Sequence, residues 1–137
     1  MSLNDLYEKM ESNRKAAKLL EEEGLYDASC NRFYYSVFQD FLFLNKKHFG
    51  YVYNRNDGGS HEALLNHFSR KINDLNSISH DMRARIGNTP TIIRDIKRMR
   101  VKADYKDDRI AIKEMEEIKK KVKYYESLHE EILKILI

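Results

Sequence analysis

The sequence predicts an all-α protein that folds as a single domain over residues 1–137. Proline and glycine, which interrupt helices, number only one and five in the whole chain. Alternating runs of β-branched and polar residues, the pattern of a half-buried strand, are scarce. Apolar residues instead recur every three or four positions, which is typical of amphipathic helices. A chain of 137 residues is also the length of one ordinary domain.

The first helix is expected to begin after Ser2, whose hydroxyl can cap it, and to end at Gly24. Acidic and basic side chains cover most of its surface, so the helix is predicted to pack by one side only. The predicted buried side consists of Leu3, Leu6, Met10, Ala17 and Leu20.

A central helix over about 26–47 is expected to organise the fold. Nine of the fourteen residues from Asn31 to Leu44 are apolar or aromatic, so this helix is predicted to be buried on several sides. We expect Phe38→Ala to cost about 3–5 kcal/mol of stability, as truncation of a buried phenylalanine does. Three polar residues at spacing four line one edge of the same helix, and they form either a structural network or the floor of a site. They are Arg32, Ser36 and Asp40.

The helical pattern breaks between Phe49 and Ser60, where several glycine, asparagine and aspartate residues predict a loop. A third helix is expected to begin at Ser60. Its predicted buried face consists of Ala63, Leu64, Phe68 and Ile72. Residues 73–87 leave two alternatives open, a short helix around 78–86 or an irregular link.

Thr89 and Pro90 predict the start of a fourth helix, with Thr89 as its cap and Pro90 in its first turn. Its predicted buried face consists of Ile92, Ile96, Met99 and Ala103. After a turn near 105–108, the last helix is expected to run from about Arg109 to the end of the chain. Its predicted buried seam consists of Met115, Ile118, Val122, Tyr125, Leu128, Ile132 and Leu136.

The composition excludes several classes of protein. Cys30 is the only cysteine, so no intramolecular disulfide can form, which favours a reducing compartment. No apolar stretch approaches the length of a membrane span, no signal peptide precedes the first helix, and no ligand spacing indicates a metal site. We therefore expect a cytoplasmic protein with no membrane partner, no metal and no cofactor.

Positive charge is concentrated in one region. The net charge of the chain is only +3, but nine basic residues face four acidic ones between Arg83 and Arg109. Such a face can hold several phosphates, or it can be a solvated helix face with weak ion pairs. Within it, Arg100 and Asp104 stand four residues apart and can pair on one helix face. We expect both at the edge of the core, paired with each other or with Arg32.

Three motifs in this chain resemble those of the HEPN domain, most closely its short stand-alone prokaryotic branch. They are YDASCNRFYYSVF at Tyr26–Phe38, SHEALL at Ser60–Leu65 and RVKADY at Arg100–Tyr105. The three motifs occur in the same order along the chain as in that family, and the resemblance covers most of the chain. The resemblance implies an up-and-down bundle of four to five helices. It also implies a homodimer in which both copies of the Arg100 motif face a shared cleft.

Catalytic HEPN proteins are metal-independent ribonucleases of toxin–antitoxin and defence systems. Their motif is an arginine followed four to six residues later by a histidine, which are thought to activate the ribose 2′-OH and stabilise the phosphorane. Here Tyr105 stands five residues after Arg100 in place of that histidine, and a tyrosine with a pKa of about 10 is a poor base at pH 7. The resemblance gives Arg100, Asp104 and Tyr105 as candidate catalytic residues. The candidate residues for binding RNA or a nucleotide are Arg32, Arg98, Lys102 and His61.

These observations leave the function, and enzymatic activity itself, open. One hypothesis is a toxin-type HEPN protein that acts on or binds RNA, with His61 or His80 supplying the imidazole if the fold or the dimer brings it to Arg100. The second is a non-catalytic module that binds a nucleotide or a partner nucleotidyltransferase. In some HEPN proteins such an enzyme modifies a tyrosine beside the motif, the place that Tyr105 occupies. The third hypothesis is a helical adaptor protein without a role in nucleic-acid binding.

Overall fold

A computed structural model describes residues 2–53, 60–105 and 109–136, and all secondary structure within these ranges is helical. The all-α prediction is confirmed. Five long helices form the bundle, and one short helix, α4, joins two of them. The helices are α1 Leu3–Glu22, α2 Tyr26–His48, α3 Ser60–Asn73, α4 His80–Ile86, α5 Thr89–Tyr105 and α6 Ile112–Ile135. None of these described helices combines the length and the apolarity that crossing a membrane requires.

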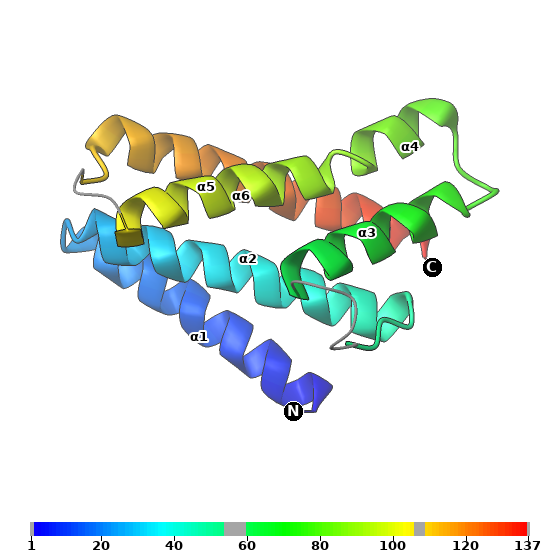
Figure 1. Ribbon diagram of the computed structural model, residues 1–137, viewed down its shortest axis with the longest axis horizontal. Helices are drawn as coiled ribbons and strands as arrows, with labels where there is room; N and C mark the ends of the chain where they lie inside the picture. Colours follow the sequence, from blue (N-terminus) through cyan, green and yellow to red (C-terminus); the bar gives the residue numbers. More distant parts are fainter. Residues whose placement is uncertain (1, 54–59, 106–108, 137) are drawn as a thin grey trace.

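Helix α2 lies along the middle of the bundle, with α1 on one side and α5 and α6 on the other (Figure 1). Its side chains supply the centre of a single hydrophobic cluster that includes residues of every helix. Phe41 and Tyr34 are fully buried, as the apolar character of this segment predicts, whereas Phe38 is only partly buried. Cys30 is buried and free, in agreement with a core position.

The ends of α1 and α4 follow local capping rules. The backbone N–H of Asp5 donates to the Ser2 hydroxyl at 3.1 Å, and Gly24 adopts a φ of 76° just after the helix ends. For residues 73–87 the sequence allowed a short helix or an irregular link, and the structure has the short helix α4. The N–H of Met82 donates to the hydroxyl of Ser79 at 3.1 Å and starts this helix.

The predicted cap of α5 is wrong. Thr89 is already the first helical residue, and its buried hydroxyl donates to the carbonyl oxygen of Ile86 at 2.7 Å instead of capping α5. The buried face of α5 is also rotated from the predicted one: Ile93 and Ile96 are buried, while Ile92 and Met99 are only partly covered. This rotation brings Arg100, seven residues after Ile93, onto the side that meets α2.

The seam of α6 is confirmed for all its predicted residues except Leu136, which is partly exposed. The helix begins at Ile112, three residues later than predicted, because the backbone N–H of Ile110 donates to the Asp27 carboxylate at 2.7 Å and ties this segment to the start of α2. Part of the predicted turn, residues 106–108, and the loop residues 54–59 lie outside the described residues.

Candidate functional site

Arg100 is the centre of a cluster of aromatic and polar side chains between α5 and α2. Its side chain is only 12% exposed, and its Nη1 donates to Asp104 Oδ2 at 3.2 Å and to the Tyr35 hydroxyl at 3.5 Å. The guanidinium carbon lies 5.2 Å from the ring centre of Tyr34, 5.5 Å from that of Tyr35 and 5.9 Å from that of Tyr105. Cation–π contacts on three rings therefore add to the ion pair.

The predicted pair of Arg100 with Asp104 is confirmed, but the predicted contribution of Arg32 is wrong. Asn31, the preceding residue, donates to Asp104 Oδ2 at 3.0 Å. Arg32 is exposed and donates instead to Asn13 on α1 at 3.1 Å. Adjacent residues on a helix differ by about 100° in direction, so only one of the two can face α5.

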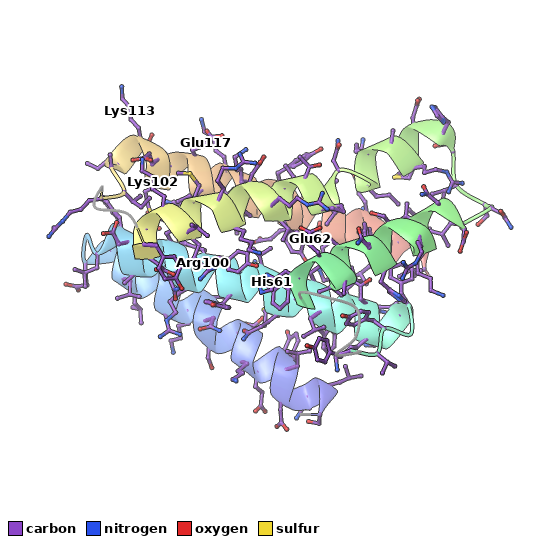
Figure 2. All side chains as sticks on the ribbon, in the orientation of Figure 1. His61, Glu62, Arg100, Lys102, Lys113 and Glu117 are labelled. Atoms are coloured by element: carbon purple, nitrogen blue, oxygen red, sulfur yellow. The ribbon has the colours of Figure 1, made fainter. Side chains whose placement is uncertain are left out.

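His61 joins this cluster from the first turn of α3, and sequence spacing gave no sign of the contacts that hold it. Its ring stacks on Phe38, with ring centres 4.2 Å apart and planes 17° from parallel. Its Nδ1 shares a hydrogen bond with the hydroxyl of Tyr34, whose ring also faces Arg100. Figure 2 shows His61 and Arg100 both lying against α2. Tyr34 thus links the imidazole to the guanidinium.

The surroundings of His61 keep its imidazole neutral. Burial, followed by the positive charges of Lys97 and Arg100, lowers the pKa of His61 to about 4. Burial also raises the pKa of the Tyr34 hydroxyl above its ordinary value, so that this group stays protonated. A neutral imidazole carries one nitrogen with a free lone pair, which can accept a proton.

The start of α3 is held to α5 by a two-point contact beside His61. Arg94 donates from Nε and Nη2 to the two carboxylate oxygens of Glu62, at 3.3 and 3.0 Å. Both side chains are substantially exposed, so this pair contributes little stability. Its effect is positional, because it fixes the residue next to His61 against the helix that carries Arg100.

The structure does not bring Arg98 or Lys102 to this cluster. Arg98 is exposed and pairs with Asp95 at 3.4 Å, while Lys102 pairs with Glu114 of α6 at 2.5 Å. Residues two positions from Arg100 point to nearly the opposite side of the helix. Figure 2 accordingly shows Lys102 on the side of α5 away from α2.

We call the six residues Tyr34, Tyr35, His61, Arg100, Asp104 and Tyr105 the Arg100 site. One polar atom of this site is unsatisfied: the Nε of Arg100 is buried and has no hydrogen-bond partner among the described residues. An unsatisfied buried donor costs about 1–3 kcal/mol, and a nearby acceptor would offset this cost. The ring of Tyr105, in contrast, is 72% exposed at the end of α5.

The Arg100 site contains one permanent cation, the Asp104 carboxylate paired with it, one neutral imidazole and several phenol hydroxyls. Among the described residues, no group of three or more histidine, cysteine, aspartate or glutamate side chains is placed to hold a metal ion. No family model, curated protein or solved structure matches this chain.

Proposed function

We propose that this chain is a HEPN-type protein that binds RNA at the Arg100 site and cleaves it there without a metal ion. The observation that carries the proposal is the link from Arg100 through Tyr34 to His61. Cleavage of RNA without a metal needs a fixed cation beside the phosphate and a proton acceptor beside the 2′-OH. In this proposal His61, from another helix, supplies the imidazole that is missing after Arg100 in sequence.

The proposed reaction assigns one role to each group. Arg100 holds the scissile phosphate, and His61 accepts the proton of the ribose 2′-OH as its oxygen attacks phosphorus. The bond from phosphorus to the 5′-oxygen breaks, and that oxygen takes up a proton from solvent, leaving a 2′,3′-cyclic phosphate and a 5′-hydroxyl. The negative charge of a bound phosphate would raise the pKa of His61 from about 4 toward the range in which a base works well at pH 7.

The test is cleavage of a defined RNA by the purified chain in EDTA, with DNA of the same sequence as a substrate that lacks the 2′-OH. We expect Arg100→Ala to lower the rate about 100-fold or more and His61→Gln to lower it by a similar factor. Arg98→Ala is the matched control, because it removes an exposed arginine from the opposite side of the same helix. An inert wild type, or an Arg100→Ala variant as active as wild type, would contradict cleavage at this site.

The alternative is a non-catalytic module that binds a nucleotide or a partner nucleotidyltransferase through the same residues. The exposure of the Tyr105 ring favours it, because an enzyme that modifies a tyrosine must reach the hydroxyl. RNA binding that depends on Arg100 but leaves the RNA intact would support this alternative. Transfer of a nucleotidyl group to the wild type but not to Tyr105→Phe, by a nucleotidyltransferase encoded beside it, would identify the partner.

A further inference from the structure

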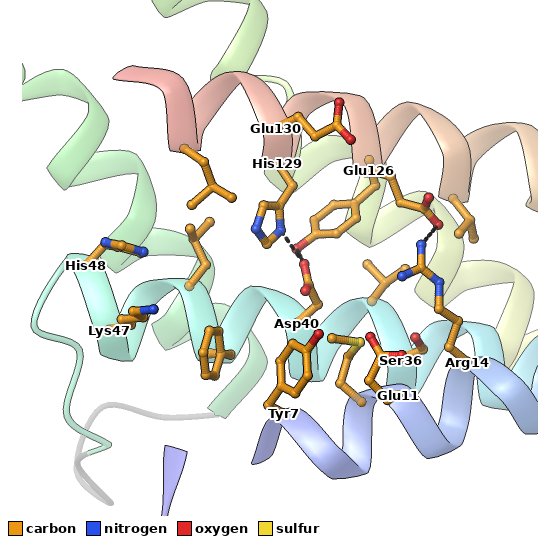
Figure 3. A pocket seen from close by; sticks show the side chains of 17 residues that line it. Tyr7, Glu11, Arg14, Ser36, Asp40, Lys47, His48, Glu126, His129 and Glu130 are labelled. Atoms are coloured by element: carbon orange, nitrogen blue, oxygen red, sulfur yellow. Dashed lines mark hydrogen bonds and ion pairs between the residues drawn. The ribbon is translucent and has the colours of Figure 1, made fainter. Parts of the chain in front are cut away.

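A second site lies on the other side of α2, in a cavity of about 380 Å³ between α1, α2 and α6 (Figure 3). Tyr34 and Asp40 are six residues apart on α2, which places them about 120° apart around the helix axis. The cavity shares no residue with the Arg100 site. Its volume falls within the range of small-molecule sites in proteins.

Asp40, Tyr125 and His129 form a hydrogen-bonded group in this cavity. Asp40 Oδ2 accepts from the Tyr125 hydroxyl at 2.6 Å and also from Nδ1 of His129. Because a carboxylate can only accept, His129 carries a proton on Nδ1, and in the neutral ring its Nε2 is an acceptor. Asp40 Oδ1 and His129 Nε2 have no hydrogen bond among the described residues and are not buried. Two acceptors are therefore available to a ligand.

The walls of the cavity around these acceptors are largely apolar. They are formed by Tyr7, Met10, Val37, Phe43, Leu44, Val122 and Leu133. Such walls bind the body of a ligand, while a few polar groups orient it. An apolar body carrying several hydrogen-bond donors would satisfy both parts of the cavity.

The charges around the cavity favour a cationic donor. Arg14 forms an ion pair with Glu126, so these two compensate each other. Glu11 and Glu130 also line the cavity, and neither makes an ion pair among the described residues. Lys47 is the opposing charge, and it lies over the ring of Phe43, 5.6 Å from its centre. Glu11 and Glu130, the two lining carboxylates without a basic partner among the described residues, therefore outnumber Lys47.

We propose that this cavity binds a small primary amine with an apolar, preferably aromatic, body. The ammonium group donates to Asp40 Oδ1, and the body packs between α1 and α6. Glu11 and Glu130 add a weaker, longer-range attraction at the rim. This site is separate from RNA binding and does not depend on the function proposed for Arg100.

The test is a titration of the ¹⁵N-labelled chain, followed by NMR, with 2-phenylethylamine as the probe. The comparison ligand is 3-phenylpropionate, which has a similar body and the opposite charge. We expect the amine to bind at least about tenfold more tightly than the acid, with shifts confined to the cavity. Equal affinities, or shifts that do not saturate, would overturn the proposal.

Variants separate the contributions of individual groups. We expect Asp40→Asn to weaken binding of the amine about tenfold, and Glu11→Gln and Glu130→Gln about twofold to fivefold each. The two glutamates are exposed, so their variants should fold even if Asp40→Asn does not. Glu8→Gln, an exposed charge on α1 outside the cavity, is the matched control and should leave the affinity unchanged. Unchanged affinity in Glu11→Gln and Glu130→Gln would contradict the proposed rim.

A second copy of the chain is the other conceivable occupant of the cavity. Its signature would be resonances of the cavity that move with protein concentration while the mass by light scattering doubles. That result would overturn the amine proposal. Arg100→Ala should bind the amine as wild type does, so loss of RNA activity and loss of amine binding can be told apart.

Discussion

His61 is the residue whose protonation most directly reports the Arg100 site. Its pKa is about 4 in the folded chain and about 6.5 when unfolded, so between these pH values the unfolded state binds more protons. Stability from the neutral imidazole is therefore fully present above pH 6.5 and is lost as the pH falls toward 4. We expect the free energy of unfolding of wild type to decrease across this window more than that of His61→Gln, measured by chemical denaturation at several pH values.

The titration of His61 can also be followed directly by NMR. A ring proton of His61 that titrates near pH 6.5 in the free protein would contradict the buried, positively charged surroundings described above. If the Arg100 site binds phosphate, adding uridine 3′-monophosphate should raise this pKa, because an anion beside the ring favours the imidazolium. The same nucleotide should leave the pKa of His61 unchanged in Arg100→Ala.

At the residue scale, the sequence predicted contacts within one helix better than contacts between helices. Arg100 and Asp104 stand four apart, and helix geometry alone brings them together. Whether Asn31 or Arg32 meets them depends on how α2 is rotated about its axis, which the packing of the whole bundle decides. The contacts of His61 were not predicted for the same reason, since its partners Tyr34 and Phe38 lie on another helix.

At the element scale, α2 owes its stability to residues that are buried to different extents. Phe41 is fully buried, whereas Phe38 is partly exposed and stacks on His61. We expect Phe41→Ala to cost about 3–5 kcal/mol in chemical denaturation. The same truncation at Phe38 should cost about half as much, below the value that the sequence predicted. Equal losses at the two positions would mean that Phe38 is as deeply buried as Phe41.

The junction between α1 and α2 depends on Gly24, whose φ of 76° lies in the left-handed region. No atom lies within 4 Å of where a Cβ would stand, so an alanine there meets no steric clash and only the backbone is strained. We expect Gly24→Ala to cost about 1 kcal/mol of unfolding free energy. Glu23→Ala is the control, because φ is −81° at that position and the change should cost far less.

Two helix starts show how far local capping rules carry a prediction. Ser2 caps α1 through a local hydrogen bond, as expected. Thr89 also has the side chain of a cap, but its buried hydroxyl makes a different local hydrogen bond, to Ile86, and α5 begins one residue earlier. The start of α6 was missed because Asp27, more than eighty positions away in the chain, holds the N–H of Ile110.

At the scale of the whole molecule, α2 separates the Arg100 site from the cavity between α1 and α6. Tyr34 and Tyr35 face Arg100 on one side, while Ser36 and Asp40 line the cavity between α1 and α6 on the other. The three polar residues predicted to line one edge of α2 therefore do not share one environment. Arg32 contacts α1, whereas Ser36 and Asp40 line the cavity. The periodicity of α2 could predict that these polar residues are aligned. It could not predict the cavity, because the cavity forms only where three helices are placed together.

One end of the bundle exposes two apolar side chains, and we predict that a second copy of the chain packs there. Leu25 at the α1–α2 junction is 55% exposed and Ile112 at the start of α6 is 61% exposed. The contact of Ile110 with Asp27 joins these two segments at the left end in Figure 1, where α5 also ends with Tyr105. A homodimer formed through this end would bring two copies of the Arg100 site together.

We therefore expect light scattering at micromolar concentration to give twice the 16.4 kDa of one chain. Charge at a dimer contact must lose its water without gaining a partner, so Leu25→Glu with Ile112→Glu should yield a monomer. Val52→Glu, which adds the same charge at an exposed position outside this end, should leave the dimer intact. If RNA cleavage depends on both copies, the double variant should lose activity while remaining folded by circular dichroism. A wild type that scatters as one chain would exclude the shared cleft and confine the proposed chemistry to the residues of a single Arg100 site.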